Sequence, residues 1–206
     1  MSKLEERSEG DPSVSRGVPG WALWLVLCSL ATVVCLLSFL VEGGEAGLHA
    51  WVRESARFST AYFGTAFAAS SLHGLWPRPW TTWLRGRRRA IGLSFAWVMT
   101  VHLAGIAALA VFYPDPFLVD RGLVTWLGGG TAYFFIYALA FTSSDRAQRM
   151  LGLSAWRRLH KVGSWVIWIV FTETLTLGVI MGDRSRLVPA LFMWMVAALR
   201  LFAYRR

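Results

Sequence analysis

Residues 90–113 of the chain read AIGLSFAWVMTVHLAGIAALAVFY and contain no charged side chain. A helix crosses about 30 Å of hydrocarbon with roughly 20 apolar residues, so this stretch predicts a transmembrane helix. Five further stretches of similar character surround it, near residues 21–41, 58–76, 123–142, 162–182 and 187–204. The 58–76 stretch is the most polar of the six. The sequence therefore predicts an all-α integral membrane protein, a bundle of six transmembrane helices.

The composition agrees with this class. Hydrophobic residues make up 55% of the 206 residues, and the mean hydropathy is +0.47. Residues 1–16 are polar and of mixed charge, which predicts a disordered cytoplasmic tail. Residues 17–206 form the predicted transmembrane domain, and no second domain is expected. The 21–41 stretch is too long for a cleavable signal sequence and lacks a small-residue cleavage site after it, so we expect a mature helix.

The distribution of Lys and Arg predicts the orientation, because loops rich in these residues stay in the cytoplasm. Fifteen of them fall before the first stretch, between the second and third, between the fourth and fifth, and after the sixth, whereas five fall in the remaining loops. Both termini are therefore predicted to be cytoplasmic, in a cell inner (plasma) membrane. The net charge of +9 is explained by anionic lipid headgroups of the bilayer, and no nucleic-acid partner is expected.

Four polar residues at membrane depth are candidates for function, because polar groups are costly there. They are His73, His102, His160 and Glu173. His102 lies roughly 18 Å into the 90–113 stretch at 1.5 Å per residue. Two interpretations of it stay open: a hydrogen bond to a neighbouring helix, or an axial ligand of haem iron inside a helical bundle.

Two motifs point to a known family. Residues 88–93, RRAIGL, precede His102 by ten residues counted from Gly92, and residues 156–161 read WRRLHK. Together they resemble the third and fifth helices of the ferric reductase-like transmembrane domain. That family includes haem-binding ferric reductases, NADPH oxidase cores and the membrane subunit of the bacterial periplasmic methionine sulfoxide reductase system. The resemblance covers roughly residues 57–204.

The resemblance implies electron transfer across the bilayer through one or two b-type haems held by histidines, here His102 and His160 as metal ligands. The family usually has a second histidine about thirteen residues after the fifth-helix one, and this chain has Glu173 there. His102 and His160 differ in depth by roughly 18 Å, so one iron does not readily bridge them. Two arrangements remain: His73 with His160 at an inner haem, or His102 at an outer haem, alone or with Glu173.

The expected function is thus a ferric reductase-like electron carrier with haem b. A separate cytoplasmic donor, a quinone or a flavin carried by a partner would supply electrons to an acceptor on the outer face. The alternative is a haem-free membrane subunit or scaffold, in which Glu173 and His102 form a buried polar pair. A small transporter ranks last, because the sequence shows no internal repeat.

Overall fold

The computed structural model describes residues 18–114 and 123–205, and these residues form helices without any strand. The helices are α1 (Gly20–Glu42), α2 (Gly44–Leu75), α3 (Pro79–Phe112), α5 (Leu123–Phe141), α6 (Asp145–Leu151), α7 (Leu153–Ile180), the 3₁₀ turn η1 (Arg184–Arg186) and α8 (Leu187–Tyr204). The predicted tail at residues 1–16 lies outside the described residues.

The prediction of an all-α membrane protein is confirmed. Within the described residues, four helices are long and apolar enough to cross a bilayer: α1, α3, α7, and the Arg184–Tyr204 stretch that includes α8. The apolar part of α5, Trp126–Phe141, is shorter than these. Helix α2 is longer than the predicted 58–76 stretch, and its first half carries charged residues such as Arg53 and Glu54. The protein is therefore a multi-pass membrane protein.

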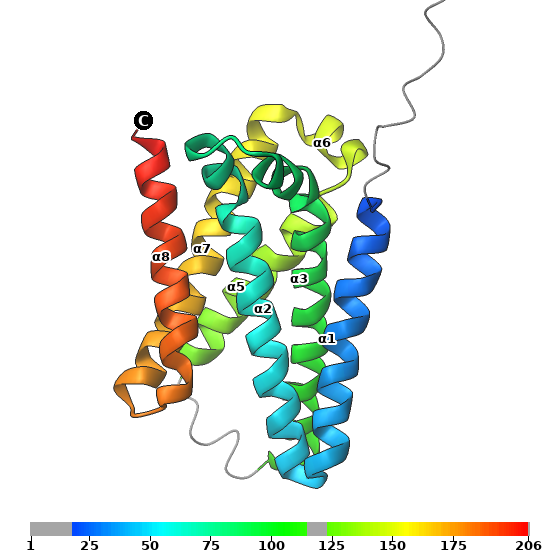
Figure 1. Ribbon diagram of the computed structural model, residues 1–206. Coiled ribbons are helices and arrows are strands. Elements are labelled where there is room, and N and C mark those ends of the chain that lie inside the picture. The colour runs from blue at the N-terminus through cyan, green and yellow to red at the C-terminus, as the bar shows by residue number, and fades with distance from the viewer. Residues whose placement is uncertain (1–17, 115–122, 206) are drawn as a thin grey trace, which may run out of the picture.

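The long helices run alternately up and down in one bundle, and the ends of the described chain, residues 18 and 205, lie at the same end of it (Figure 1). The α2–α3 connection, α6 and the start of α7 also lie at this end, which we call the basic end. At the opposite end, which we call the turn end, α1 turns into α2 and α7 passes through η1 into α8. The short helix α6 begins at Ser144, whose hydroxyl accepts a hydrogen bond from the backbone N–H of Ala147.

The connection between α1 and α2 is a tight reversal without a loop. Gly43 and Gly44 have φ angles of 67° and 51°, a region that favours glycine because it has no Cβ atom. Helix α2 can therefore begin one residue after the α1 cap and pack along it. At the other end of α2, Pro79 occupies the first turn of α3, where its missing N–H is not needed. Residues 77–89, which lie between the second and third predicted stretches, were expected to form a loop. Most of them instead form the start of α3.

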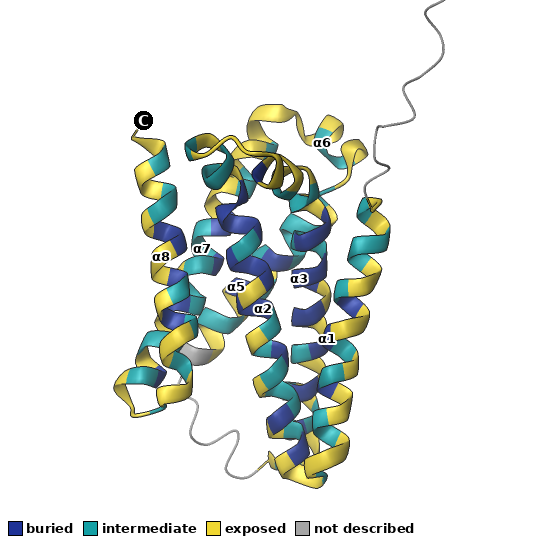
Figure 2. Ribbon diagram, viewed as in Figure 1, coloured by how far each residue is buried: buried dark blue, intermediate teal, exposed yellow. Residues whose placement is uncertain are grey.

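Helix α2 is the centre of the bundle and contacts α1, α3 and α8. Its buried face is rich in small residues, which let neighbouring helices approach closely. At Gly64 an added Cβ would overlap the ring of Phe192 on α8. The buried residues follow the faces where these helices meet (Figure 2). The core cluster includes Phe63 and Phe67 of α2 and Phe95 of α3, and Phe171 of α7 packs against it.

Candidate functional site

A cavity of about 850 Å³ lies among α2, α3, α5, α7 and α8, toward the basic end of the bundle. Its inner wall is apolar and includes the buried residues Phe63, Phe95 and Ile167. Exposed residues of its rim include Arg85 and Lys161. A volume of this size falls in the range of sites that hold small molecules and cofactors. The apolar wall and the charged rim together suit an amphipathic anion.

His160 is the one histidine among the residues that line this cavity. Its Nε2 lies 3.1 Å from the hydroxyl oxygen of Thr142, and its ring stacks on Trp156 with the ring centres 4.3 Å apart. The indole N–H of Trp156 in turn donates to the carbonyl of Thr142 at 2.9 Å. Thr142 and Trp156 therefore fix the orientation of the imidazole, as outer partners do for metal-binding histidines.

Cationic side chains surround the same cavity. Arg88 donates to the hydroxyl of Ser70 at 3.2 Å, and neither Arg88 nor Arg200 has an ion pair within the part of the chain that the structure describes. Arg89 differs, because its guanidinium pairs with Asp145 at 3.0 Å. Four of the five arginines that line the cavity, all except Arg89, thus form no ion pair with an acidic side chain of the described residues. An anionic ligand would compensate their positive charge.

Arg200 also lines the cavity and was not predicted from the sequence. Its guanidinium carbon lies 4.1 Å above the ring of Phe67 and 5.6 Å from that of Trp165, and it donates weakly to the Phe67 carbonyl at 3.4 Å. A cation placed on aromatic faces is stabilised by their negative electrostatic potential. A lone arginine inside the apolar sequence of α8 was the available signal, because such a residue usually faces a cavity or a partner.

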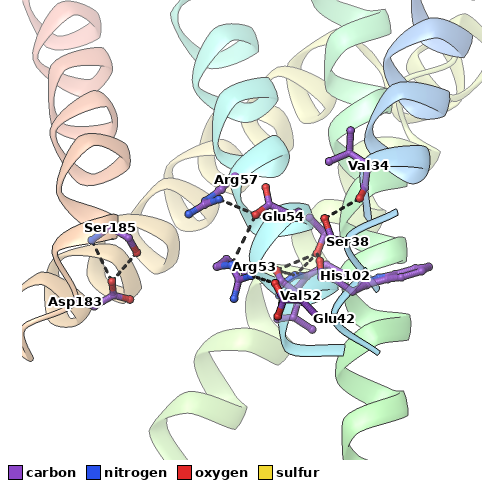
Figure 3. A network of polar contacts seen from close by, with 12 residues as sticks. Val34, Ser38, Glu42, Val52, Arg53, Glu54, Arg57, His102, Asp183 and Ser185 are labelled. Atoms are coloured by element: carbon purple, nitrogen blue, oxygen red, sulfur yellow. Dashed lines mark hydrogen bonds and ion pairs between the residues drawn. The ribbon is translucent and has the colours of Figure 1, made fainter. Parts of the chain in front are cut away.

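His102 lies away from this cavity, in the half of α3 nearer the turn end. Its Nδ1 is 2.9 Å from the Ser55 hydroxyl and 3.1 Å from the Val52 carbonyl, both on α2 (Figure 3). Phe95 is the α3 cavity-lining residue nearest to His102 in sequence, and seven residues of helix separate them by roughly 10 Å. The first interpretation of His102, a hydrogen bond to a neighbouring helix, describes these contacts.

The other two candidates are also apart from His160. His73 lies in the last turn of α2, where its Nδ1 is 3.3 Å from the Thr81 hydroxyl, and it is not among the residues lining the cavity. Glu173 is exposed on α7 and has no hydrogen bond or ion pair to any other described residue. The structure therefore brings neither His73 to His160 nor Glu173 to His102.

The described residues contain no group of three or more His, Cys, Asp or Glu side chains that could hold a metal ion together. His160 is the candidate residue whose imidazole lines the basic-end cavity. No known family model matches the chain, so the resemblance to the ferric reductase-like domain rests on its two sequence motifs.

Proposed function

We propose that the chain lies in the inner (plasma) membrane of the cell and crosses it six times. Both termini are then in the cytoplasm. The alternating direction of the long helices supports this, with α2 and α5 as the two additional spans. The basic end carries Arg85, Arg88, Arg89, Arg157 and Lys161, with Asp145 as an acidic partner. At the turn end, acidic and basic residues are mixed (Figure 3). Loops rich in Lys and Arg stay in the cytoplasm, so the basic end is the cytoplasmic end.

Within this fold, we propose that the cavity at the basic end holds one b-type haem and that His160 is its protein ligand. The observation that carries the proposal is the presence of an oriented imidazole in a cavity with an apolar inner wall and uncompensated arginines. When bound, the haem would supply a one-electron redox centre. Its two propionates would meet Arg88 and Arg200, and its apolar macrocycle would meet the aromatic wall.

The chain's own residues would then have separate tasks. Thr142 and Trp156 orient His160. Arg200 stays in place through its stacking on Phe67. Phe63 and Phe95 close the inner wall and exclude water from it. The exposed cations of the rim would attract an acidic cytoplasmic donor, while a quinone or a flavin carried by a partner is the other source of electrons. The acceptor would lie on the outer face.

The haem-free scaffold is the second candidate, and a specific observation favours it. Among the described residues, Glu173 is exposed on α7, whereas Nδ1 of His102 hydrogen-bonds to Ser55 and Val52 of α2, so Glu173 and His102 do not form a ligand pair. In this candidate the fold persists for a structural role, and the basic-end cavity holds another anion or an anionic lipid.

A reduced-minus-oxidised absorbance spectrum separates the two candidates. The protein is expressed with ample haem, purified in detergent, and its haem is quantified per polypeptide. We expect a b-type spectrum with about one haem per chain. His160→Ala should abolish it, whereas His73→Ala, His102→Ala and Glu173→Ala should retain it.

A second variant tests the location of the site without touching the ligand. A Cβ added at Gly92 meets no atom within 4 Å, and Gly92 lines the cavity, so Gly92→Phe should fill the cavity at little cost to the fold. We expect this variant to lose haem and to keep its helical circular dichroism. A folded wild-type sample without stoichiometric haem would refute the proposal and leave the scaffold as the function. Haem that survives both His160→Ala and Gly92→Phe would place the cofactor elsewhere.

A further inference from the structure

One stripe of α7 is largely exposed, although its Thr176 accepts a hydrogen bond from the Trp194 indole of α8 at 3.3 Å. Its residues follow one another at alternating intervals of four and three: Val162, Val166, Ile169, Glu173, Thr176 and Ile180. Val162, Ile169 and Ile180 are about half-exposed or more, at 48%, 53% and 74%. Buried residues of α7, such as Ser164 and Ile167, lie on another face. We call this set the α7 stripe.

The spacing allows the stripe to pack along a partner helix. Alternating intervals of four and three average 3.5 residues, the repeat that keeps one seam of a helix against a partner helix of the same kind. Any single face of an α-helix has intervals of three and four, so the evidence for pairing comes from the residue types in the stripe. β-Branched side chains occupy most of the stripe, and these lose little conformational entropy on packing because their rotamers are already restricted.

Glu173 lies within the stripe and cannot be satisfied by lipid. It is seven residues, roughly 10 Å, from the end of α7 at Ile180. It is exposed and has no hydrogen bond or ion pair to another described residue. A carboxyl group at this depth needs a hydrogen-bonding partner, because hydrocarbon offers none. A second molecule would supply such a partner.

We propose that two copies of this chain pair through the α7 stripe, with the Glu173 carboxyl groups hydrogen-bonded to each other across a two-fold axis. Copies inserted in the same direction present α7 in parallel and at the same depth, so each stripe residue meets its own counterpart. A carboxyl group suits such a self-complementary contact, since it accepts hydrogen bonds and donates one when protonated. A single polar residue in an apolar seam also fixes the register of the two helices.

The surface beside the stripe supports this pairing. A shallow hollow of about 440 Å³ lies at its basic end, lined by residues of α5 and α7 that include Phe135, Leu159 and Val162. Side chains of a second α7 would enter such a hollow. The dimer places the two basic-end cavities on the bundle sides of the α7 pair, so pairing leaves the proposed cofactor site accessible and does not depend on it.

Cysteine cross-linking in lipid vesicles tests the proposal. The native Cys28 and Cys35 are replaced by alanine, and single cysteines are introduced as Val162→Cys, Ile169→Cys and Ile180→Cys. Thr174→Cys is the matched control, because Thr174 is also exposed on α7 but lies outside the stripe. At high lipid-to-protein ratio, we expect oxidation to produce covalent dimers at the three stripe positions and not at Thr174. Equal yields at all four positions, or none, would overturn the proposal.

Energy transfer between labelled copies then tests the role of Glu173. Glu173→Gln keeps a hydrogen-bonding side chain and should leave dimerisation nearly unchanged. Glu173→Leu should raise the dimer dissociation constant by about 3- to 20-fold, the range expected for an interhelical hydrogen bond in a membrane. Because Glu173 is exposed in the single chain, neither variant should change the circular dichroism or the haem content. An unchanged dissociation constant in Glu173→Leu would overturn the carboxyl contact.

Discussion

Replacing Gly105 with alanine is expected to destabilise the protein, although alanine normally favours a helix. Gly105 is buried on α3 where α3 meets α2. A Cβ added there would lie 2.7 Å from Cδ1 of Trp51 and 3.0 Å from Cγ2 of Val52. Ordinary van der Waals contact between carbon atoms begins near 3.5 Å. The two helices must therefore separate or Trp51 must move.

The magnitude follows from two opposing effects. Overpacking by one methyl group in a tight core costs about 1–3 kcal/mol. The higher helix propensity of alanine offsets this by about 0.5–1 kcal/mol. Trp51 has little freedom to move, because its indole N–H donates to the Val101 carbonyl at 2.9 Å. We therefore expect a net loss of about 1–2 kcal/mol, together with a disturbed His102 environment.

Gly92→Ala is the matched control on the same helix, because an added Cβ meets nothing within 4 Å there. It should leave stability unchanged or raise it by about 0.5–1 kcal/mol. Thermal unfolding in detergent, followed by tryptophan fluorescence, compares the two variants with the wild type. Equal midpoints for Gly105→Ala and Gly92→Ala would refute the close approach of α2 and α3 at Trp51.

Three further predictions concern other residues. Thr172 is buried, and its hydroxyl oxygen has no hydrogen-bond partner among the described residues, so Thr172→Val should raise the free energy of unfolding by about 1 kcal/mol in the same fluorescence assay. Cys35 is fully buried, so maleimide labelling of this thiol should be slow in the folded protein and fast after denaturation. Hydrogen bonds from Ser185 and Arg186 lower the pKa of Asp183. The ionised carboxylate therefore adds stability above the ordinary carboxylate pKa. This stability is lost as the pH falls through the lowered pKa of the folded protein. Asp183→Asn should therefore be less stable than the wild type near neutral pH, and the difference should vanish in acid unfolding experiments.

The helices whose bounds could be predicted from the sequence are those that are apolar along most of their length. The bounds of α1 and α8 were predicted within a residue or two, because each helix is apolar over nearly its whole length and is flanked by charged residues. The first half of α2 was not predicted as a helix, because its charged residues Glu45, Arg53 and Glu54 are typical of a loop outside the membrane. Its helical state depends on the glycine turn at residues 43–44 and on packing against α1 and α3, and single-sequence hydropathy contains neither.

The site was predictable in part for a related reason. His160 was predicted as a candidate because histidine is uncommon at membrane depth. The cavity around it is formed by five helices together, so the sequence alone could not show it. Arg200 was missed because it was treated as part of an apolar stretch. The separation of His102 and His160 in depth was predictable from the helical rise alone, while the contact of His102 with Ser55 required the packing of α2 on α3.

The two candidate residues of α7, His160 and Glu173, face different ways, and helix geometry explains why. Thirteen residues separate His160 from Glu173, and at about 100° per residue this rotates the side chain by roughly 220°. His160 lines the cavity, so Glu173 faces away from it. The exposure of Glu173 on the α7 stripe agrees with this. Position 173 therefore does not face the cavity that His160 lines. The proposed functions follow this division: one haem per chain held from the inner face of α7, and pairing with a second copy through its outer face.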